Sequence, residues 1–93
     1  MDEKNAIIVG VITGKESEYE TFFEEMERLV EALDLYVCAL LTQQLKNPNP
    51  ATYVGKGKIE EICEVVKETD ASYVIFSETL SPAQHRNITK SID

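Results

Sequence analysis

The sequence predicts a small α/β domain, a three-layer βαβαβα fold with a parallel sheet and its first strand in the centre. Three apolar, β-branched runs alternate along the chain with three segments of helical periodicity. The first run, residues 6–12, is continuously apolar, which is typical of a strand covered on both faces. Strands and helices of these lengths in alternation imply right-handed crossovers. At 93 residues, the chain has room for one domain over residues 1–93.

The first helix is expected to begin at Ser17, because Glu20 follows three residues later in the spacing of a capping box. Its apolar residues recur at helical intervals and are expected to face the core: Phe22, Phe23, Met26, Leu29, Val30 and Leu33. The glutamates between them fit a solvated acidic face rather than a metal site.

The middle of the chain predicts a second strand, a loop and a second helix. Residues 36–41 form an apolar run that is expected to end near residue 43 or 44. Two Asn-Pro steps within residues 45–52 exclude regular helix and mark a loop. A helix then begins at residues 55–58 and ends within residues 69–72. Its apolar face is formed by Ile59, Ile62, Cys63, Val65 and Val66.

The last part of the chain predicts a short strand and a capped helix. Residues 73–76 form the third strand. Ser81 is the expected N-cap, Pro82 the first helical residue and Gln84 the third. No C-cap signal follows Ile92, so we expect this helix to continue beyond residue 93.

The composition is that of a globular protein without an export or membrane signal. The chain is 43% hydrophobic and 28% charged, which argues against intrinsic disorder. It has no apolar run of about 18 residues and no signal-peptide pattern. Cys38 and Cys63 lie in apolar stretches and are expected to be buried thiols rather than a disulfide. We therefore expect a cytoplasmic protein with no membrane span.

The net charge of −8 is concentrated near the beginning of the chain. Residues 1–34 carry ten acids and three bases, whereas residues 35–93 carry seven acids and six bases. The stretch of residues 45–59 holds Lys46, Lys56 and Lys58 and no acid. The overall acidity disfavours non-specific nucleic-acid binding, but this stretch leaves one edge where a phosphate backbone could be met.

Residues 55–58, Gly-Lys-Gly-Lys, do not form a Walker A loop. Such a loop has glycine five residues before its Gly-Lys pair and Ser or Thr after it, but this chain has Thr52 and Ile59 there. Two interpretations remain open: an anion site at a glycine-flanked helix start, or a purely structural flexible loop.

No catalytic group can be assembled from this sequence. His85 is the only histidine, and no Ser or Cys nucleophile is arranged around it, so we expect a surface histidine. Gln84, Arg86 and Asn87 are polar and lie near a helix start, where Arg86 could contact phosphate or pair with a carboxylate. We expect no enzyme activity, no cofactor and no metal site in this chain.

Two segments resemble the N-terminal domain of HflX-type ribosome-associated GTPases. Residues 51–62 read ATYVGKGKIEEI, where that family has roughly TYIGKGKLEEL, and residues 80–88 read LSPAQHRNI, where it has LSPxQxRNL. The separation of the two segments also fits the family, as does the intervening strand with Phe76 and Glu78. The similarity is clear over about residues 45–88, and the first half agrees in its strand–helix–strand layout.

The resemblance implies a longer protein, in which a helical linker and a GTP-binding domain follow this domain. Such proteins bind the large ribosomal subunit, hydrolyse GTP with Mg²⁺ and are linked to splitting or rescuing stalled ribosomes. None of the GTPase motifs occurs in these 93 residues, so GTP and Mg²⁺ would belong to the missing domain. By analogy, this domain docks on the large subunit and its rRNA and packs against its own linker and GTPase domain. The candidate contact residues are Lys56, Lys58, Gln84, Arg86 and Asn87, with Gly55 and Gly57 at the helix entrance.

A structural explanation covers part of this set. Gly55 and Gly57 would serve backbone geometry at a helix entrance, and Gln84 would serve capping. This explanation does not cover Arg86 or the two lysines, which we expect to be exposed. Two alternatives to ribosome docking also stay open. One is a regulatory module that packs on the GTPase domain through the first or last helix, and the other is a small nucleotide- or anion-binding domain at the carboxyl ends of the strands.

Overall fold

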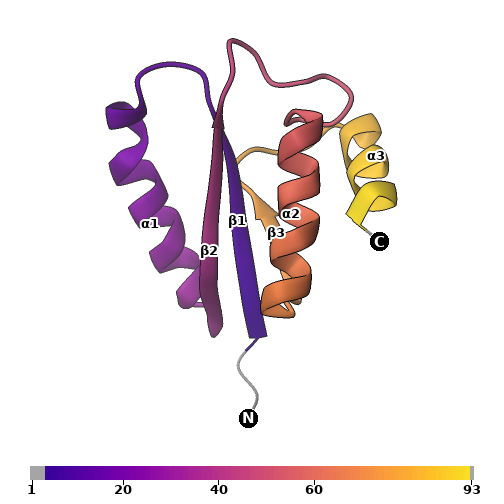
Figure 1. Ribbon diagram of the computed structural model, residues 1–93. Helices are drawn as coiled ribbons and strands as arrows, with labels where there is room; N and C mark the ends of the chain where they lie inside the picture. Colours follow the sequence, from indigo (N-terminus) through magenta and orange to yellow (C-terminus); the bar gives the residue numbers. More distant parts are fainter. Residues whose placement is uncertain (1–3, 93) are drawn as a thin grey trace.

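The computed structural model describes residues 4–92 and confirms the predicted fold. Three parallel strands alternate with helices, in the sheet order β2-β1-β3 with the first strand central (Figure 1). The elements are β1 Lys4–Ile12, the 3-10 helix η1 Glu16–Tyr19, α1 Glu20–Glu31, β2 Leu35–Gln44, α2 Lys56–Thr69, β3 Tyr73–Phe76 and α3 Pro82–Ile92.

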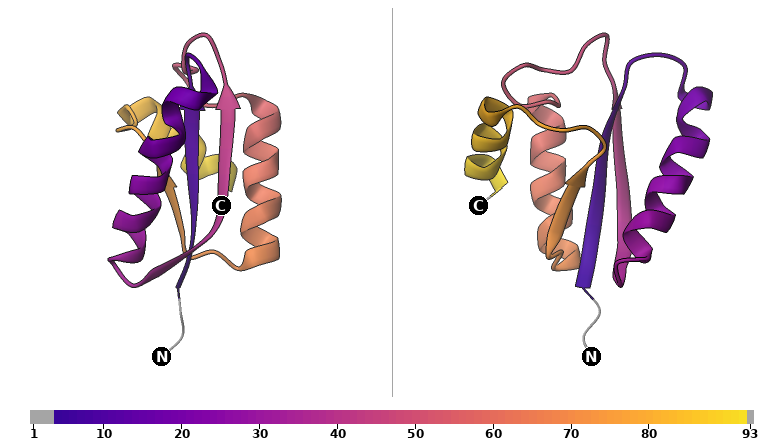
Figure 2. Two further views of the ribbon diagram at one scale, coloured as in Figure 1. Left: turned by 90° about the vertical axis from the view of Figure 1, so that its left-hand side faces the viewer. Right: turned by 180° about the vertical axis from the view of Figure 1, so that it is seen from behind.

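Helices cover both faces of the sheet, which gives the three predicted layers. α1 lies on one face, and α2 and α3 lie on the other (Figure 1, Figure 2). The strand order explains this arrangement, because the β1–α1–β2 and β2–α2–β3 connections cross the sheet in opposite directions while both are right-handed. In the described part of the chain, no helix has the length and apolarity that a membrane span requires.

β1 is the most buried element, as its continuous apolar run predicts. Its residues 6–12 are all buried, and their side chains alternate between two apolar cores. The core against α2 and α3 contains Ile7, Val9, Val11, Tyr53, Val54, Ile59, Ile62 and Ile88. The core against α1 contains Ala6, Ile8, Ile12, Phe23 and Val30. Gly10 lets α1 approach the strand closely, because an added Cβ would lie 2.5 Å from the Phe23 ring.

The start of α1 differs from the predicted capping box. Ser17 lies within η1, α1 begins only at Glu20, and its N-cap Tyr19 makes no side-chain capping bond. The Tyr19 ring stacks on Phe23 with the ring centroids 6.0 Å apart, and its hydroxyl lies 3.2 Å from Thr13 Oγ1. These tertiary contacts hold the chain in a tighter turn ahead of the helix, so the predicted cap does not form.

Half of the predicted apolar face of α1 is exposed. Phe23 and Val30 are buried. Leu29 is 70% exposed, Leu33 71% and Phe22 39%, so the expectation that they face the core is wrong. Successive helical residues are about 100° apart around the axis. A helix that buries Phe23 and Val30 therefore turns Phe22 and Leu29 toward its flank. Leu33 is exposed because α1 ends at Glu31 and Leu33 lies in the turn that follows.

Both cysteines are free thiols, as predicted, but they are half-buried rather than buried. Cys38 is the extra residue of a β-bulge in β2. Its thiol donates a hydrogen bond of 3.4 Å to the Ala6 carbonyl, and the Cys63 thiol donates one of 3.3 Å to the Ser91 carbonyl. These contacts give each thiol a local partner at the border of the core.

Candidate functional site

Three connections meet at the carboxyl ends of the strands, at the upper end of Figure 1. Residues 13–15 follow β1, residues 45–55 form the β2–α2 loop, and residues 77–81 follow β3. This end of an open α/β sheet is where ligands usually bind. All seven candidate residues lie within the first turns of α2 and α3 or next to them.

Tyr53 fixes the β2–α2 loop to the sheet. The residue is 2% exposed and has a left-handed backbone with φ of 66°. Its hydroxyl accepts a hydrogen bond of 3.1 Å from the Val11 N–H and is bonded to Ser77 Oγ, also at 3.1 Å. The ring meets Phe76 edge-on, with the centroids 5.7 Å apart. Tyr53 thus occupies the space between the ends of β1 and β3, and this disfavours the alternative of a nucleotide site there.

Asn49 folds the β2–α2 loop into a turn. Its Oδ1 accepts hydrogen bonds from the N–H groups of Ala51 at 2.8 Å and Thr52 at 3.3 Å. Its backbone pairs with that of Tyr53 through two hydrogen bonds of 2.7 and 3.0 Å. Residues 49–53 of the loop are therefore held together by their own hydrogen bonds.

Two candidate residues, Gln84 and Asn87, hold this turn against α3. Gln84 Nε2 donates to the Asn49 carbonyl at 2.8 Å, and Asn87 Nδ2 donates to the Ala51 carbonyl at 2.9 Å. Gln84 also closes the helix start, because its Oε1 accepts from the Ser81 N–H at 2.9 Å while Ser81 Oγ accepts from the Gln84 N–H at 3.1 Å. This reciprocal pair confirms the predicted cap. Both amide side chains have partners inside the domain.

The start of α2 has no such closure. Its N-cap is Gly55, and no side chain in residues 4–92 caps its first N–H groups. Lys56 is exposed, and the first turn contains no acidic residue. A helix N-terminus with free N–H groups and a lysine attracts anions. Chemically, this end of α2 offers positive charge and hydrogen-bond donors.

The fold favours glycine at one of the two glycine positions at the start of α2 but not at the other. Gly55 has a negative φ of −70°, and its N–H donates to Gln43 Oε1 at 2.8 Å. A Cβ at Gly55 would come within 3.1 Å of the Gln43 amide, so the fold itself favours glycine there. A Cβ at Gly57 would meet nothing within 4 Å, and φ is not positive there either. The domain fold therefore gives no reason for Gly57.

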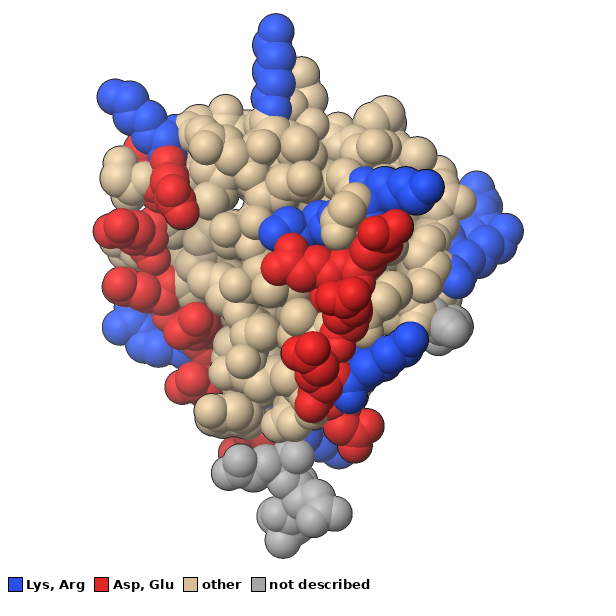
Figure 3. Space-filling model, viewed as in Figure 1, with Lys and Arg blue, Asp and Glu red and all other residues tan. Residues whose placement is uncertain are grey.

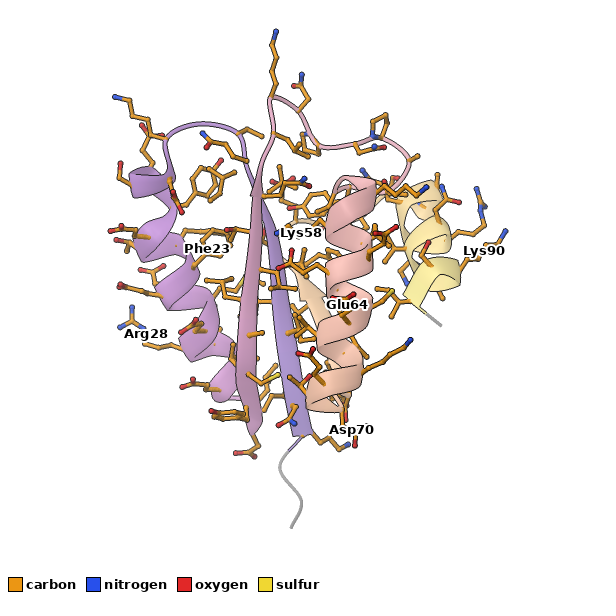
Figure 4. All side chains as sticks on the ribbon, viewed as in Figure 1. Phe23, Arg28, Lys58, Glu64, Asp70 and Lys90 are labelled. Atoms are coloured by element: carbon orange, nitrogen blue, oxygen red, sulfur yellow. The ribbon has the colours of Figure 1, made fainter. Side chains whose placement is uncertain are left out.

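Lys58 is not the exposed lysine that the sequence predicts. Its Nζ pairs with Glu61 Oε2 at 2.7 Å, and its side chain is only 17% exposed. The two residues are three apart in α2 and so lie on one side of the helix. Figure 4 labels Lys58 at the upper end of α2. Because the charge of Lys58 is compensated, Lys56 is the lysine of the Gly-Lys-Gly-Lys segment that has no acidic partner among residues 4–92.

Charge is unevenly distributed over the surface (Figure 3). Acidic side chains form columns over α1 and α2, and basic side chains project from the loop end and from the side of α3. We call the exposed Lys46, Lys56 and Arg86, together with the open start of α2, the basic rim. His85 is also exposed, as predicted. Within residues 4–92, no three His, Cys, Asp or Glu side chains gather as a metal site.

Sequence reasoning missed three residues that shape this end of the molecule, namely Asn49, Tyr53 and Gln43. Asn49 starts a turn, and the Asn-Pro step does carry that signal. The role of Tyr53 depends on a positive φ and on a partner 42 residues away, which no local pattern reveals. The sequence indicates for Gln43 only a place near the end of a strand, and its bond to Gly55 at the start of α2 is likewise tertiary.

Comparison with known families defines the class of this chain. The family described as GTP-binding GTPase N-terminal matches residues 20–93. The chain therefore belongs to this family of N-terminal domains.

The individual relatives are proteins named GTPase HflX, and this chain matches their N-terminal region, which confirms the resemblance found in the sequence. The chain is 38% identical to GTPase HflX of Flavobacterium psychrophilum over 92 residues, covering 97% of this chain and 22% of the relative. It is 37% identical over 91 residues to that of Lacrimispora saccharolytica, covering 98% and 22%. For Escherichia coli the identity is 37% over 87 residues, covering 94% and 20%. The chain thus spans about a fifth of the length of these relatives.

Proposed function

We propose that this chain is the docking domain of an HflX-like GTP-binding protein and contacts rRNA of the large ribosomal subunit through the basic rim. The open start of α2 is the observation that carries the proposal. Lys56 is exposed beside N–H groups that no side chain of the described residues caps, and Gly57 leaves room for close approach of a phosphate. Cations and helix N-termini together are the groups that neutralise a phosphate backbone.

The bonded β2–α2 loop supports the same proposal. Tyr53 bonds the loop to β1, Gln84 and Asn87 bond it to α3, and the exposed Lys46 lies within it. Binding through a preorganised loop does not have to order that loop first, which strengthens association.

Five of the ten acids in residues 1–34 lie in α1, away from the start of α2. α1 covers the other face of the sheet from α2 and α3, so its glutamates and the start of α2 belong to different layers (Figure 1, Figure 3). In the complete protein, GTP hydrolysis with Mg²⁺ would belong to a GTPase domain that follows through a linker. The protein would act in the cytoplasm on ribosomes that must be split or rescued.

Co-sedimentation with purified large ribosomal subunits, at low and at moderate salt, tests this proposal. Lys46→Glu/Lys56→Glu reverses two charges of the basic rim. The control, Lys4→Glu/Lys67→Glu, reverses two charges far from the rim, at the start of β1 and in the last turn of α2. We expect salt-dependent binding of the wild type and the control, and a loss of about tenfold or more in the rim variant. Equal binding of the two variants would contradict docking through the rim.

A second function, regulation of the GTPase domain, is favoured by exposed apolar side chains at the end of α1 and in the turn that follows it. Leu29, in the last turn of α1, is 70% exposed, and Leu33, two residues past the end of the helix, is 71% exposed. Neighbouring exposed apolar residues mark a surface that packs on another protein part. Leu29→Glu/Leu33→Glu in the full-length protein should alter GTP turnover in the absence of ribosomes, with subunit binding retained. Unchanged turnover would speak against this function.

A further inference from the structure

The free edge of β2 is a surface distinct from the basic rim. Within residues 4–92, β2 pairs only with β1, so its other side presents unpaired backbone groups. The strand has ten residues, none of them buried, and contains no charged residue and no proline. Edge strands are usually short or protected by lysine, proline or a bulge. The bulge at Cys38 interrupts only the first part, and residues 39–44 keep a regular register with β1.

Acidic side chains flank this edge on both sides. A groove of about 230 Å³ runs between α1 and β2, with Phe23 and Leu40 among its apolar residues and Glu16, Glu20, Glu24 and Glu27 along it. On the other side, α2 carries Glu60, Glu64 and Glu68, all exposed. Figure 3 looks onto this edge and shows an uncharged stripe between two acidic columns. An occupant of the edge would therefore be placed between two rows of carboxylates.

We propose that this edge binds an extended, basic segment of a partner protein, which adds to the sheet as a further strand beside β2. The backbone of residues 39–44 would supply the hydrogen bonds, as in other cases of strand addition. Side chains of an added strand point alternately to the two faces of the sheet, so lysines or arginines on either face would meet the glutamates of α1 or α2.

The negative charge beside the edge favours a basic segment over a second copy of this chain or a nucleic acid. A second copy paired through the same edge would bring its acidic columns against those of the first, and each copy has a net charge of −8. Nucleic acid would be repelled by the same glutamates. The acidic columns thus protect an otherwise unguarded edge from self-association and leave it open to a basic partner.

The test is an NMR titration of the 93-residue chain with a synthetic nine-residue peptide in which lysine alternates with valine. A matched peptide with glutamate in place of lysine is the control. The lysine peptide should shift the amide signals of β2 and slow hydrogen exchange within residues 39–44. The glutamate peptide should do neither, and the signals at the start of α2 should stay unchanged with both.

Variants separate strand addition from general charge attraction. Glu20→Gln/Glu24→Gln removes two negative charges from the groove and should lower the affinity for the lysine peptide about fivefold at low salt. Glu18→Gln/Glu25→Gln removes the same charge outside the groove and should weaken it less than about twofold. Leu40→Lys, at a side chain that is 38% exposed, should abolish binding while the fold is kept. Equal losses in the two charge variants, or shifts without protection of residues 39–44, would overturn the proposal. A dimer in analytical ultracentrifugation without peptide would assign the edge to a second copy and overturn it as well.

Discussion

The two helices on one face of the sheet begin in opposite ways. α3 begins with a reciprocal bond between Ser81 and Gln84, and Gln84 also holds the carbonyl of Asn49. α2 begins at Gly55 without a side-chain cap, and the next residue, Lys56, is exposed. Both starts belong to the segments that resemble the family. The difference teaches that two helix starts within one family resemblance can differ: one is closed by side chains of the domain, and the other is not capped by any side chain among residues 4–92.

Substitution of Tyr53, which fixes the loop between β2 and α2, should have the largest effect on the free energy of unfolding. Tyr53→Ala deletes a buried ring and should lower the free energy of unfolding by about 3–5 kcal/mol. Tyr53→Phe keeps the ring but leaves the buried Val11 N–H without its partner, so a loss of about 1–3 kcal/mol is expected. Urea unfolding measures both. A Tyr53→Phe variant as stable as the wild type would show that the hydroxyl does not hold the loop.

Opening the start of α3 should have the next largest effect. Gln84→Ala removes the reciprocal cap and the bond to the loop, with an expected loss of about 1–2 kcal/mol. The exposed neighbour Arg86 provides the control, because Arg86→Ala should change stability by less than about 0.5 kcal/mol. Urea unfolding of the two variants measures the difference. Equal stability of the two variants would remove the distinction between a closed and an open helix start.

A substitution at the start of α2, Gly57→Ala, should stabilise the domain instead of destabilising it. Gly57→Ala places a methyl group in empty space within a helix and should raise the free energy of unfolding by about 0.5–1 kcal/mol. The same methyl group occupies the space through which a phosphate would approach, so affinity for large subunits should fall. Thermal unfolding and co-sedimentation provide the two measurements. A variant that is more stable and binds equally well would leave Gly57 without a docking role.

The smallest effect is expected from the two lysines of α2. Lys58→Gln breaks the pair with Glu61 and should cost no more than about 0.5 kcal/mol. Lys56→Gln should not lower stability, because Lys56 is exposed and a positive charge is unfavourable at a helix N-terminus. Thermal unfolding of the two variants side by side measures this difference. A larger loss in Lys56→Gln would reverse the assignment of the free lysine.

The fold could be predicted because its signals are local and agree with one another. The apolar run of β1 is buried throughout residues 6–12, and the spacing of Ser81 and Gln84 gives the cap that forms. Ser17 and Glu20 have the same spacing, yet their cap does not form, because the contacts of Tyr19 fix a different turn. Local patterns succeed where tertiary contacts do not compete with them.

The candidate site was less predictable for the same reason. Lys58 can reach Glu61 at a spacing of three, and Lys56 could equally reach Glu60 at a spacing of four. Among residues 4–92, only the first of these pairs forms. The choice between the two depends on side-chain conformations that the sequence does not reveal. The sequence therefore predicts the helix start at residues 55–58 but not which of its lysines is paired.

The most direct test of this account is the salt dependence of binding to large ribosomal subunits. The logarithm of the association constant should be measured against the logarithm of the salt concentration for the wild type, Lys56→Gln and Lys58→Gln. If Lys56 contacts a phosphate, Lys56→Gln should make the slope less steep by roughly 0.7–0.9, which is the contribution of one lysine–phosphate contact. The slope for Lys58→Gln should equal that of the wild type, because Lys58 is already paired with Glu61. Equal slopes for all three proteins, or a change with Lys58→Gln alone, would contradict docking through the open start of α2.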